Sequence, residues 1–177
     1  MSISASRKAI NKSIEVYEKL LEGFSEEVFV RTPAEGVWSY GEVYAHIFSS
    51  TLGCIRAIDV CSRGTAIENN ESLPFSIKLV LFLKRLPPGK YKVPEKIAKD
   101  VKKISRTEAR ELIKKSREQL KDIETLIKSA SPTQKVKHPR LGLFNARQWF
   151  AFTHIHLRHH ERQLYRIRAM HKGATTV

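Results

Sequence analysis

The feature that most constrains this chain is an uninterrupted helical pattern from Asn145 to His171. Asn145 and Gln148 have the spacing of a helix-capping pair, and no proline or glycine follows them within the stretch. Side chains that recur every three or four residues gather on one side of such a helix: Trp149, Phe152, Thr153, His156, His160, Gln163, Leu164 and Ile167. We therefore predict a long helix with this side inward and with Arg158, Glu161 and Arg162 toward water.

Two imidazoles on the inward side lie one turn apart. His156 and His160 are separated by about 40° around the helix axis, so both rings can reach one cation. A histidine on an apolar face is more often a hydrogen-bonded core residue, and this helix also carries His154 and His159. Catalytic zinc-type sites need three protein ligands and an open position, so the pair alone does not predict a metal site. A third ligand must come from elsewhere in the chain.

The remaining pattern predicts an all-α four-helix bundle in a single domain, residues 1–177. A first helix is expected from Ser4 to Phe24, and Gly23 lies near its end. Capping boxes predict a second helix from Ser39 to about Cys61 and a third from Ser105 to about Ala130. The connecting segments 25–38, 63–71 and 131–144 read as loops, and no strand is expected.

A long, partly helical insertion separates the second and third helices. Its first part, Leu73 to Leu86, is apolar and predicts a short helix lying across the bundle. Pro87, Pro88, Gly89 and Pro94 exclude a regular helix after it, so we expect an extended excursion over the surface there.

The second predicted helix supplies a third imidazole. His46 shares a helix face with Ser50, Gly53 and Ala57, whose small side chains favour a cavity over a filled core. The alternative is a packed histidine bonded to a neighbouring hydroxyl group. With the pair on the last helix, His46 gives the count of three imidazoles that a divalent ion with an exchangeable fourth position needs.

Two motifs at these histidines resemble those of the DinB/YfiT-like metalloenzymes. The opening W-S-x-x-E-x-x-x-H motif of that family matches Trp38, Ser39, Glu42 and His46, and the closing H-x-x-x-H-x-x-Q motif matches His156, His160 and Gln163. The segment HPRLGLFNARQW, residues 138–149, is similar to the one that precedes the closing helix in this family. The resemblance runs from end to end, although the specific motifs are confined to these segments.

The resemblance implies a four-helix bundle in which three histidines bind a divalent metal ion, most often nickel or zinc. Carried onto this chain, the ligands are His46, His156 and His160, and a water completes the shell. His154 lies roughly opposite His156 and is expected outside the site, whereas His159 is expected at its rim. Gln163 and Glu42, each one turn from a ligand, are candidates to orient the ligand imidazoles, the alternative being capping or surface residues.

Such a site would activate either water or a thiol. The first use predicts a hydrolase, and the second predicts a thiol S-transferase that acts on a small-molecule substrate such as a low-molecular-weight thiol. No nucleophile triad, phosphate loop or dinucleotide motif offers a rival chemistry, and the sequence does not select between the two. The alternative class is a non-catalytic, stress-related binding module whose basic surface contacts acidic partners.

The net charge of +14 is concentrated between Lys84 and Lys121, which hold fourteen Lys or Arg against five Asp or Glu. This stretch contains one aromatic residue, Tyr91, and no nucleic-acid-binding motif, so we expect a solvated basic face and no nucleic-acid partner.

The two cysteines, Cys54 and Cys61, are typical of core residues in a protein of a reducing compartment. The chain shows no secretory signal, so we expect a cytoplasmic protein without a membrane partner. A homodimer is expected only from the habit of the family.

Overall fold

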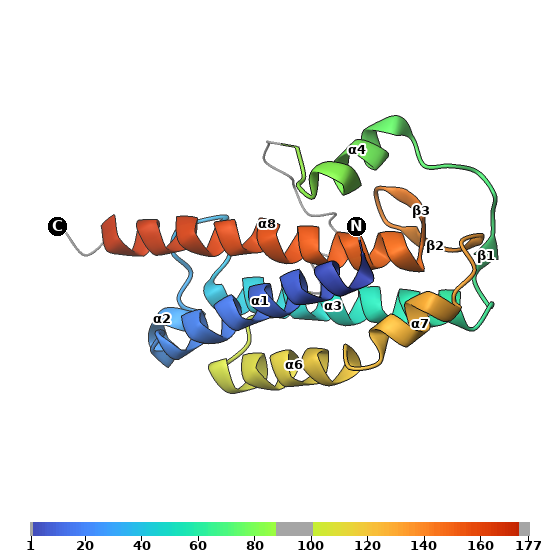
Figure 1. The fold of residues 1–177 in the computed structure, drawn as a ribbon. Helices are drawn as coiled ribbons and strands as arrows, with labels where there is room; N and C mark the ends of the chain where they lie inside the picture. The colour runs from blue at the N-terminus through green and yellow to red at the C-terminus, as the bar shows by residue number, and fades with distance from the viewer. Residues whose placement is uncertain (1, 88–100, 174–177) are drawn as a thin grey trace.

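The computed structural model describes residues 2–87 and 101–173, and it confirms the four-helix bundle. The four long helices run nearly side by side (Figure 1). They are α1 (Ile3–Glu22), α3 (Tyr40–Ser62), α6 (Arg106–Gln119) and α8 (Ala146–Gly173). Apolar side chains from all four helices form one core at their centre.

A buried pair of tyrosines ties three of these helices together. The Tyr17 hydroxyl on α1 donates a hydrogen bond to the Leu157 carbonyl on α8, at 2.8 Å. The Tyr44 hydroxyl on α3 donates to the Tyr17 carbonyl at 2.7 Å. Burial raises the pKa of the Tyr17 and Tyr44 hydroxyl groups, which therefore stay protonated and able to donate. Because Leu157 adjoins His156, these bonds fix the height of the histidine face of α8 relative to α1 and α3.

The helices begin where the capping residues predict. Ser39 and Glu42 form a complete capping box at α3, and Ser105 and Glu108 form one at α6. At α8, the Asn145 side chain accepts from the Gln148 amide at 3.0 Å, and the Gln148 side chain accepts from the Asn145 amide at 2.9 Å. Each pair satisfies two amide groups that a helix start leaves without partners.

The expectation of no strands is wrong. A small antiparallel sheet has the order β1 (Ile67–Glu68), β2 (Gln134–His138) and β3 (Gly142–Asn145). Val136 pairs with Phe144 in the β2–β3 hairpin, and Phe144 is fully buried. Gly142 supplies a φ of 91° that the hairpin turn requires and that other residues seldom adopt. The hairpin leads directly into α8, so it fixes where the histidine helix begins.

Two further expectations need correction. The segment 25–38 contains a short helix, α2 (Glu26–Val30), which is capped by the Ser25 side chain and buries Phe29. The predicted third helix is interrupted, because α6 ends at Gln119 and α7 (Ile123–Ser129) follows. Leu120 and Ile123 are both buried at the interruption, and the Arg7 guanidinium donates to the Lys121 carbonyl at 3.4 Å. Tertiary contacts thus stabilise this break in the helix, although the sequence has no proline or glycine there.

The insertion begins with the expected short helix, α4 (Phe75–Leu83), which lies against α8. The extended excursion predicted after it falls mostly outside the described residues. A buried lysine anchors the root of the insertion: the Lys135 ammonium on β2 donates to the Asn69 side chain at 2.9 Å and to the Glu71 carbonyl. No helix in the described ranges is long and apolar enough to cross a membrane.

The two capping boxes provide a matched test of how burial affects a helix cap. Ser39 is fully buried and Ser105 is partly exposed, although their bonds have the same pattern. We expect Ser39→Ala to lower the free energy of unfolding by about 2 kcal/mol and Ser105→Ala to lower it by about 0.5 kcal/mol, the two ends of the range for helix caps. Urea unfolding of the two variants measures both values. Equal losses would contradict a role for burial.

Candidate metal centre

The structure brings together the three histidines that the sequence singled out. His46 comes from α3, and His156 and His160 come from α8. One ligand atom from each ring lies within 4.8 Å of the other two. The ring centroids are 4.6 Å apart for His156 and His160, 4.8 Å for His46 and His160, and 5.2 Å for His46 and His156. His46 and His160 are buried, and His156 is half-buried. The side chains thus converge from two helices on one point.

Gln163 sets the proton position on one of these rings. The Nδ1 atom of His160 lies 2.7 Å from the Gln163 side-chain oxygen. An amide oxygen can only accept a hydrogen bond, so Nδ1 must carry the proton. The Nε2 atom of His160 is then unprotonated, and it lies 3.1 Å from Nε2 of His156. The predicted orienting role of Gln163 therefore has its contact, and it turns a lone pair of His160 into the cluster.

The donor set fits a divalent ion of the zinc or nickel type. Imidazole nitrogen is a preferred ligand for both metals. In a tetrahedral site with metal–nitrogen bonds of about 2.0 to 2.1 Å, ligand nitrogens lie about 3.3 Å apart. The 3.1 Å between the Nε2 atoms of His156 and His160 is close to that spacing. That an ion binds there remains a prediction.

Burial keeps the three imidazoles neutral. Desolvation lowers the pKa of His46 to about 4, with a smaller contribution from His159. Desolvation also lowers the pKa of His156 and His160 well below the ordinary value, and neighbouring imidazoles add to the effect. Neutral imidazole is the form that binds metal, so no imidazolium has to be deprotonated before binding at neutral pH.

Aromatic rings surround the three histidines. Trp38 lies 5.2 Å from His46 between ring centroids, and Phe152 stacks on His156 at 5.3 Å and 19°.

His138 lies next to one of these rings. Its ring centroid is 4.5 Å from that of Phe152, in an edge-to-face arrangement. The Nδ1 atom of His138 accepts hydrogen bonds from the amides of Arg140 and Leu141, both at 3.1 Å, so the ring is locked in one orientation. Sequence reasoning gave His138 no role, and its position before Pro139 at a turn was the available signal.

The remaining sequence candidates have separate positions. His154 lies outside the cluster, as predicted, although it is buried. His159 is half-buried with its ring centroid 5.0 Å from that of His160, which agrees with a position at the rim. The Glu42 carboxylate accepts from the Ser39 amide at 2.8 Å and from its hydroxyl at 2.6 Å, so Glu42 is a capping residue. Glu161 is half-buried, whereas Arg158 and Arg162 are exposed as expected.

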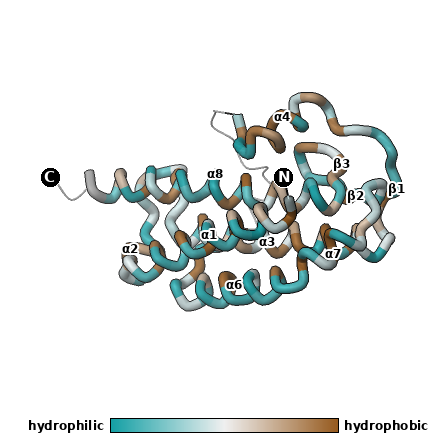
Figure 2. The backbone as a smooth tube through the Cα atoms, viewed as in Figure 1, coloured by the Kyte–Doolittle hydropathy of each residue, from teal (hydrophilic) through white to brown (hydrophobic). Residues whose placement is uncertain are grey.

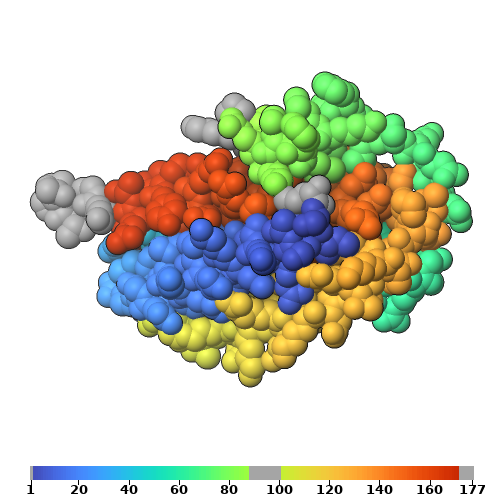
Figure 3. Space-filling model, in the orientation of Figure 1, coloured from blue at the N-terminus to red at the C-terminus, as the bar shows by residue number. Residues whose placement is uncertain are grey.

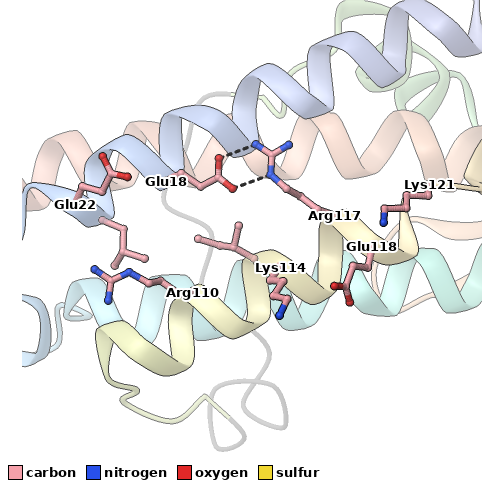
Figure 4. A pocket seen from close by; sticks show the side chains of 9 residues that line it. Glu18, Glu22, Arg110, Lys114, Arg117, Glu118 and Lys121 are labelled. Atoms are coloured by element: carbon pink, nitrogen blue, oxygen red, sulfur yellow. Dashed lines mark hydrogen bonds and ion pairs between the residues drawn. The ribbon is translucent and has the colours of Figure 1, made fainter.

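A surface cavity of about 400 Å³ lies elsewhere, between α1 and α6. Figure 4 shows its charged walls, where the Arg117 guanidinium pairs with both oxygens of Glu18 at 2.7 and 2.6 Å. Glu22, Arg110, Lys114, Glu118 and Lys121 complete the charged lining. None of the three histidines lines this cavity, and its mixed exposed charges are typical of a solvated ion-pair surface.

The family follows from comparison with known proteins. The model of the DinB superfamily matches residues 9–164, which include all three histidines. The chain belongs to the DinB superfamily. A solved four-helix bundle protein, TT2238, has the same fold with a TM-score of 0.57 and 18% sequence identity, over 93% of this chain and 98% of that chain. No curated protein matches the chain significantly.

Replacement of single histidines by alanine tests the ligand set of this DinB-superfamily protein. We expect His156→Ala and His160→Ala to lose a bound divalent ion because two imidazoles hold it too weakly. We expect His154→Ala to retain the ion, since this side chain lies outside the cluster. Metal content of the purified variants, with circular dichroism as a check of folding, measures the difference. Loss of metal from His154→Ala would contradict the assignment.

The lowered pKa values predict acid sensitivity of the metal-free protein. Between pH 6.5 and about 4, the unfolded chain protonates His46 while the folded chain keeps it neutral, so stability falls as the pH falls through this window. Above pH 6.5 both states are neutral and the effect is absent. Unfolding by urea at a series of pH values measures it, and His46→Gln should reduce the dependence without abolishing it, because burial also lowers the pKa of His156 and His160. An unperturbed imidazole would exchange a bound metal for a proton near pH 6.5. The lowered pKa of His46 moves this competition between proton and metal to a lower pH.

Proposed function

We propose that this protein is a metal-dependent enzyme in which His46, His156 and His160 hold one divalent ion, nickel or zinc. The convergence of three neutral imidazoles within 4.8 Å carries the proposal. Three protein nitrogens leave a coordination position for an exogenous ligand, which is the pattern of catalytic rather than structural sites. A divalent ion held in this way lowers the pKa of a water or thiol that binds it, so the reaction classes are hydrolysis and thiol transfer.

The charge around the cluster favours an anionic ligand. The three donors are neutral, so a bound divalent ion would keep its full charge of +2. The nearby groups that influence the rings add positive charge: Arg162 and Arg166 act on His159, and Arg166 acts on His160. A thiolate or a hydroxide would reduce this excess of positive charge. We therefore favour a small-molecule substrate that binds as an anion, and a low-molecular-weight thiol meets that requirement.

The residues of the chain have distinct tasks in this proposal. Gln163 holds the proton on Nδ1 of His160, so that Nε2 would be free to bind an ion. Trp38 and Phe152 cover His46 and His156 and limit the access of water to the rings. His159, whose ring centroid lies 5.0 Å from that of His160, is our candidate for proton exchange with a bound substrate.

Replacement of Gln163 tests the orienting role separately. We expect Gln163→Leu to weaken metal affinity by about 10- to 100-fold, the usual effect of losing a group that orients a ligand imidazole. Gln163→Glu should keep most of the affinity, because a carboxylate also accepts from Nδ1. Competition with a chromophoric chelator measures both constants. Equal affinity of the leucine variant and the unchanged protein would show that His160 needs no such support.

A thiol titration of the cobalt-substituted protein tests the choice of substrate. Cobalt(II) takes the place of zinc and reports sulfur ligation by a charge-transfer band in the near ultraviolet. We expect cysteine or a similar small thiol to produce this band, and His160→Ala to abolish it. Stoichiometric metal without the band would favour the hydrolase. Strong salt-sensitive nucleic-acid binding without metal would instead support the non-catalytic binding module.

A further inference from the structure

The outer face of α4 exposes an unusual amount of apolar surface. The side chains of Phe75 and Phe82 are 80% and 79% exposed, and those of Leu83 and Leu79 are 53% and 42% exposed. Positions 75, 79, 82 and 83 share one side of a helix. Large apolar side chains gathered in this way mark an interaction surface far more often than single exposed residues do.

The packing of α4 on the bundle does not use these side chains. Val80 is buried, and Ile77 and Leu81 pack against the core from the opposite side of the helix. Figure 1 shows α4 lying over α8 at the edge of the molecule, and its apolar residues stand out in Figure 2. In the space-filling view, α4 is raised above the surface of α8 (Figure 3). The outer face of α4 therefore points away from the core, and its four large apolar side chains are exposed.

The charged residues within the α4 segment are all basic. Between Ser72 and Pro87 the chain holds Lys78, Lys84 and Arg85 and no acidic residue. Lys78 and Arg85 are exposed. Exposed phenylalanine and leucine side chains can enter the boundary of a bilayer, and the neighbouring lysine and arginine are complementary to anionic headgroups.

We propose that the outer face of α4 binds the surface of an anionic membrane. Phe75, Leu79, Phe82 and Leu83 would enter the boundary between headgroups and acyl chains, while Lys78 and Arg85 contact lipid phosphates. A second copy of the chain fits less well, because a two-fold axis at this face would bring like charges together. This peripheral contact differs from the sequence-based expectation of no membrane partner, and it does not depend on the metal centre.

Vesicle sedimentation tests the proposal with the full chain. We expect the protein to sediment with vesicles of phosphatidylcholine and phosphatidylglycerol, and not with vesicles of phosphatidylcholine alone. Binding should weaken as salt is raised, because the cations act through screened charges. Lys78→Gln should lower the partition constant by about five-fold, the usual effect of one basic residue near an anionic surface. Equal binding to neutral vesicles, or no binding to either, would overturn the proposal.

Matched substitutions assign the binding to α4. We expect Phe75→Ser with Phe82→Ser to lower the partition constant by about ten-fold or more, since two anchoring rings are lost. Tyr165→Ser with Met170→Ser is the control, because these half-exposed side chains lie on α8, and it should bind as the unchanged protein does. Circular dichroism checks that both variants fold.

Two readouts separate a membrane from a protein partner. In a Phe82→Trp variant, indole fluorescence should shift to shorter wavelength on adding anionic vesicles, as the ring leaves water. The mass of the unchanged protein in solution should be the same as that of the Phe75→Ser, Phe82→Ser variant. A dimer that the two serine substitutions dissociate would assign the face to a second copy of the chain. Equal lipid binding by the serine variant would likewise overturn the proposal.

Discussion

The packing of α8 along α3 is the interaction on which the rest of this structure depends. The two helices share the centre of the core, and the histidines lie on the seam between them. The tyrosine bonds from Tyr44 to Tyr17 and from Tyr17 to Leu157 prevent the helices from sliding along one another. A register shift of one residue along the helical screw, a rise of about 1.5 Å with a rotation of about 100°, would turn the face of α8 and take His156 and His160 away from His46. The tyrosine hydrogen bonds, which lie next to the histidine cluster, therefore help to set its position.

The burial of three imidazoles in the cluster has an energetic cost for folding, and the same burial favours the binding of a divalent cation. Three imidazoles at close range in a buried site cannot all become charged imidazolium ions, because desolvation and mutual repulsion both oppose the charge. The same conditions keep the rings neutral, and a divalent cation can bind the lone pairs of neutral rings. A folded state that gains a ligand in this way is stabilised by the binding free energy. A site of this kind couples its function to its stability.

Local capping signals explain which elements the sequence predicts correctly. The hydrogen bonds of Ser39 with Glu42 and of Asn145 with Gln148 form within one turn of helix, so neighbouring residues specify them. The inward placement of His156 and His160 follows from helical periodicity. A catalytic metal site needs a third protein donor, and a search of the other predicted helices for one leads to His46. His46 was accessible to such reasoning because it also lies on a helix with a clear start.

The elements that sequence reasoning missed depend on distant residues. The strand at Gln134–His138 is held between Ile67–Glu68 and Gly142–Asn145, and its short length carries little pattern of its own. The break after Gln119 is stabilised by Arg7, more than a hundred residues away in the chain. Such contacts leave no signal in a local window.

The insertion between α3 and α6 is anchored at both ends by hydrogen bonds. The Lys135 ammonium fastens the segment before α4 to the hairpin before α8. At its far end the insertion returns through a capped start of α6, where the Arg106 amide also meets Glu26. Both of these hydrogen-bonded anchors use elements other than α3 and α8, so the insertion is fastened without drawing on the two helices that carry the three histidines.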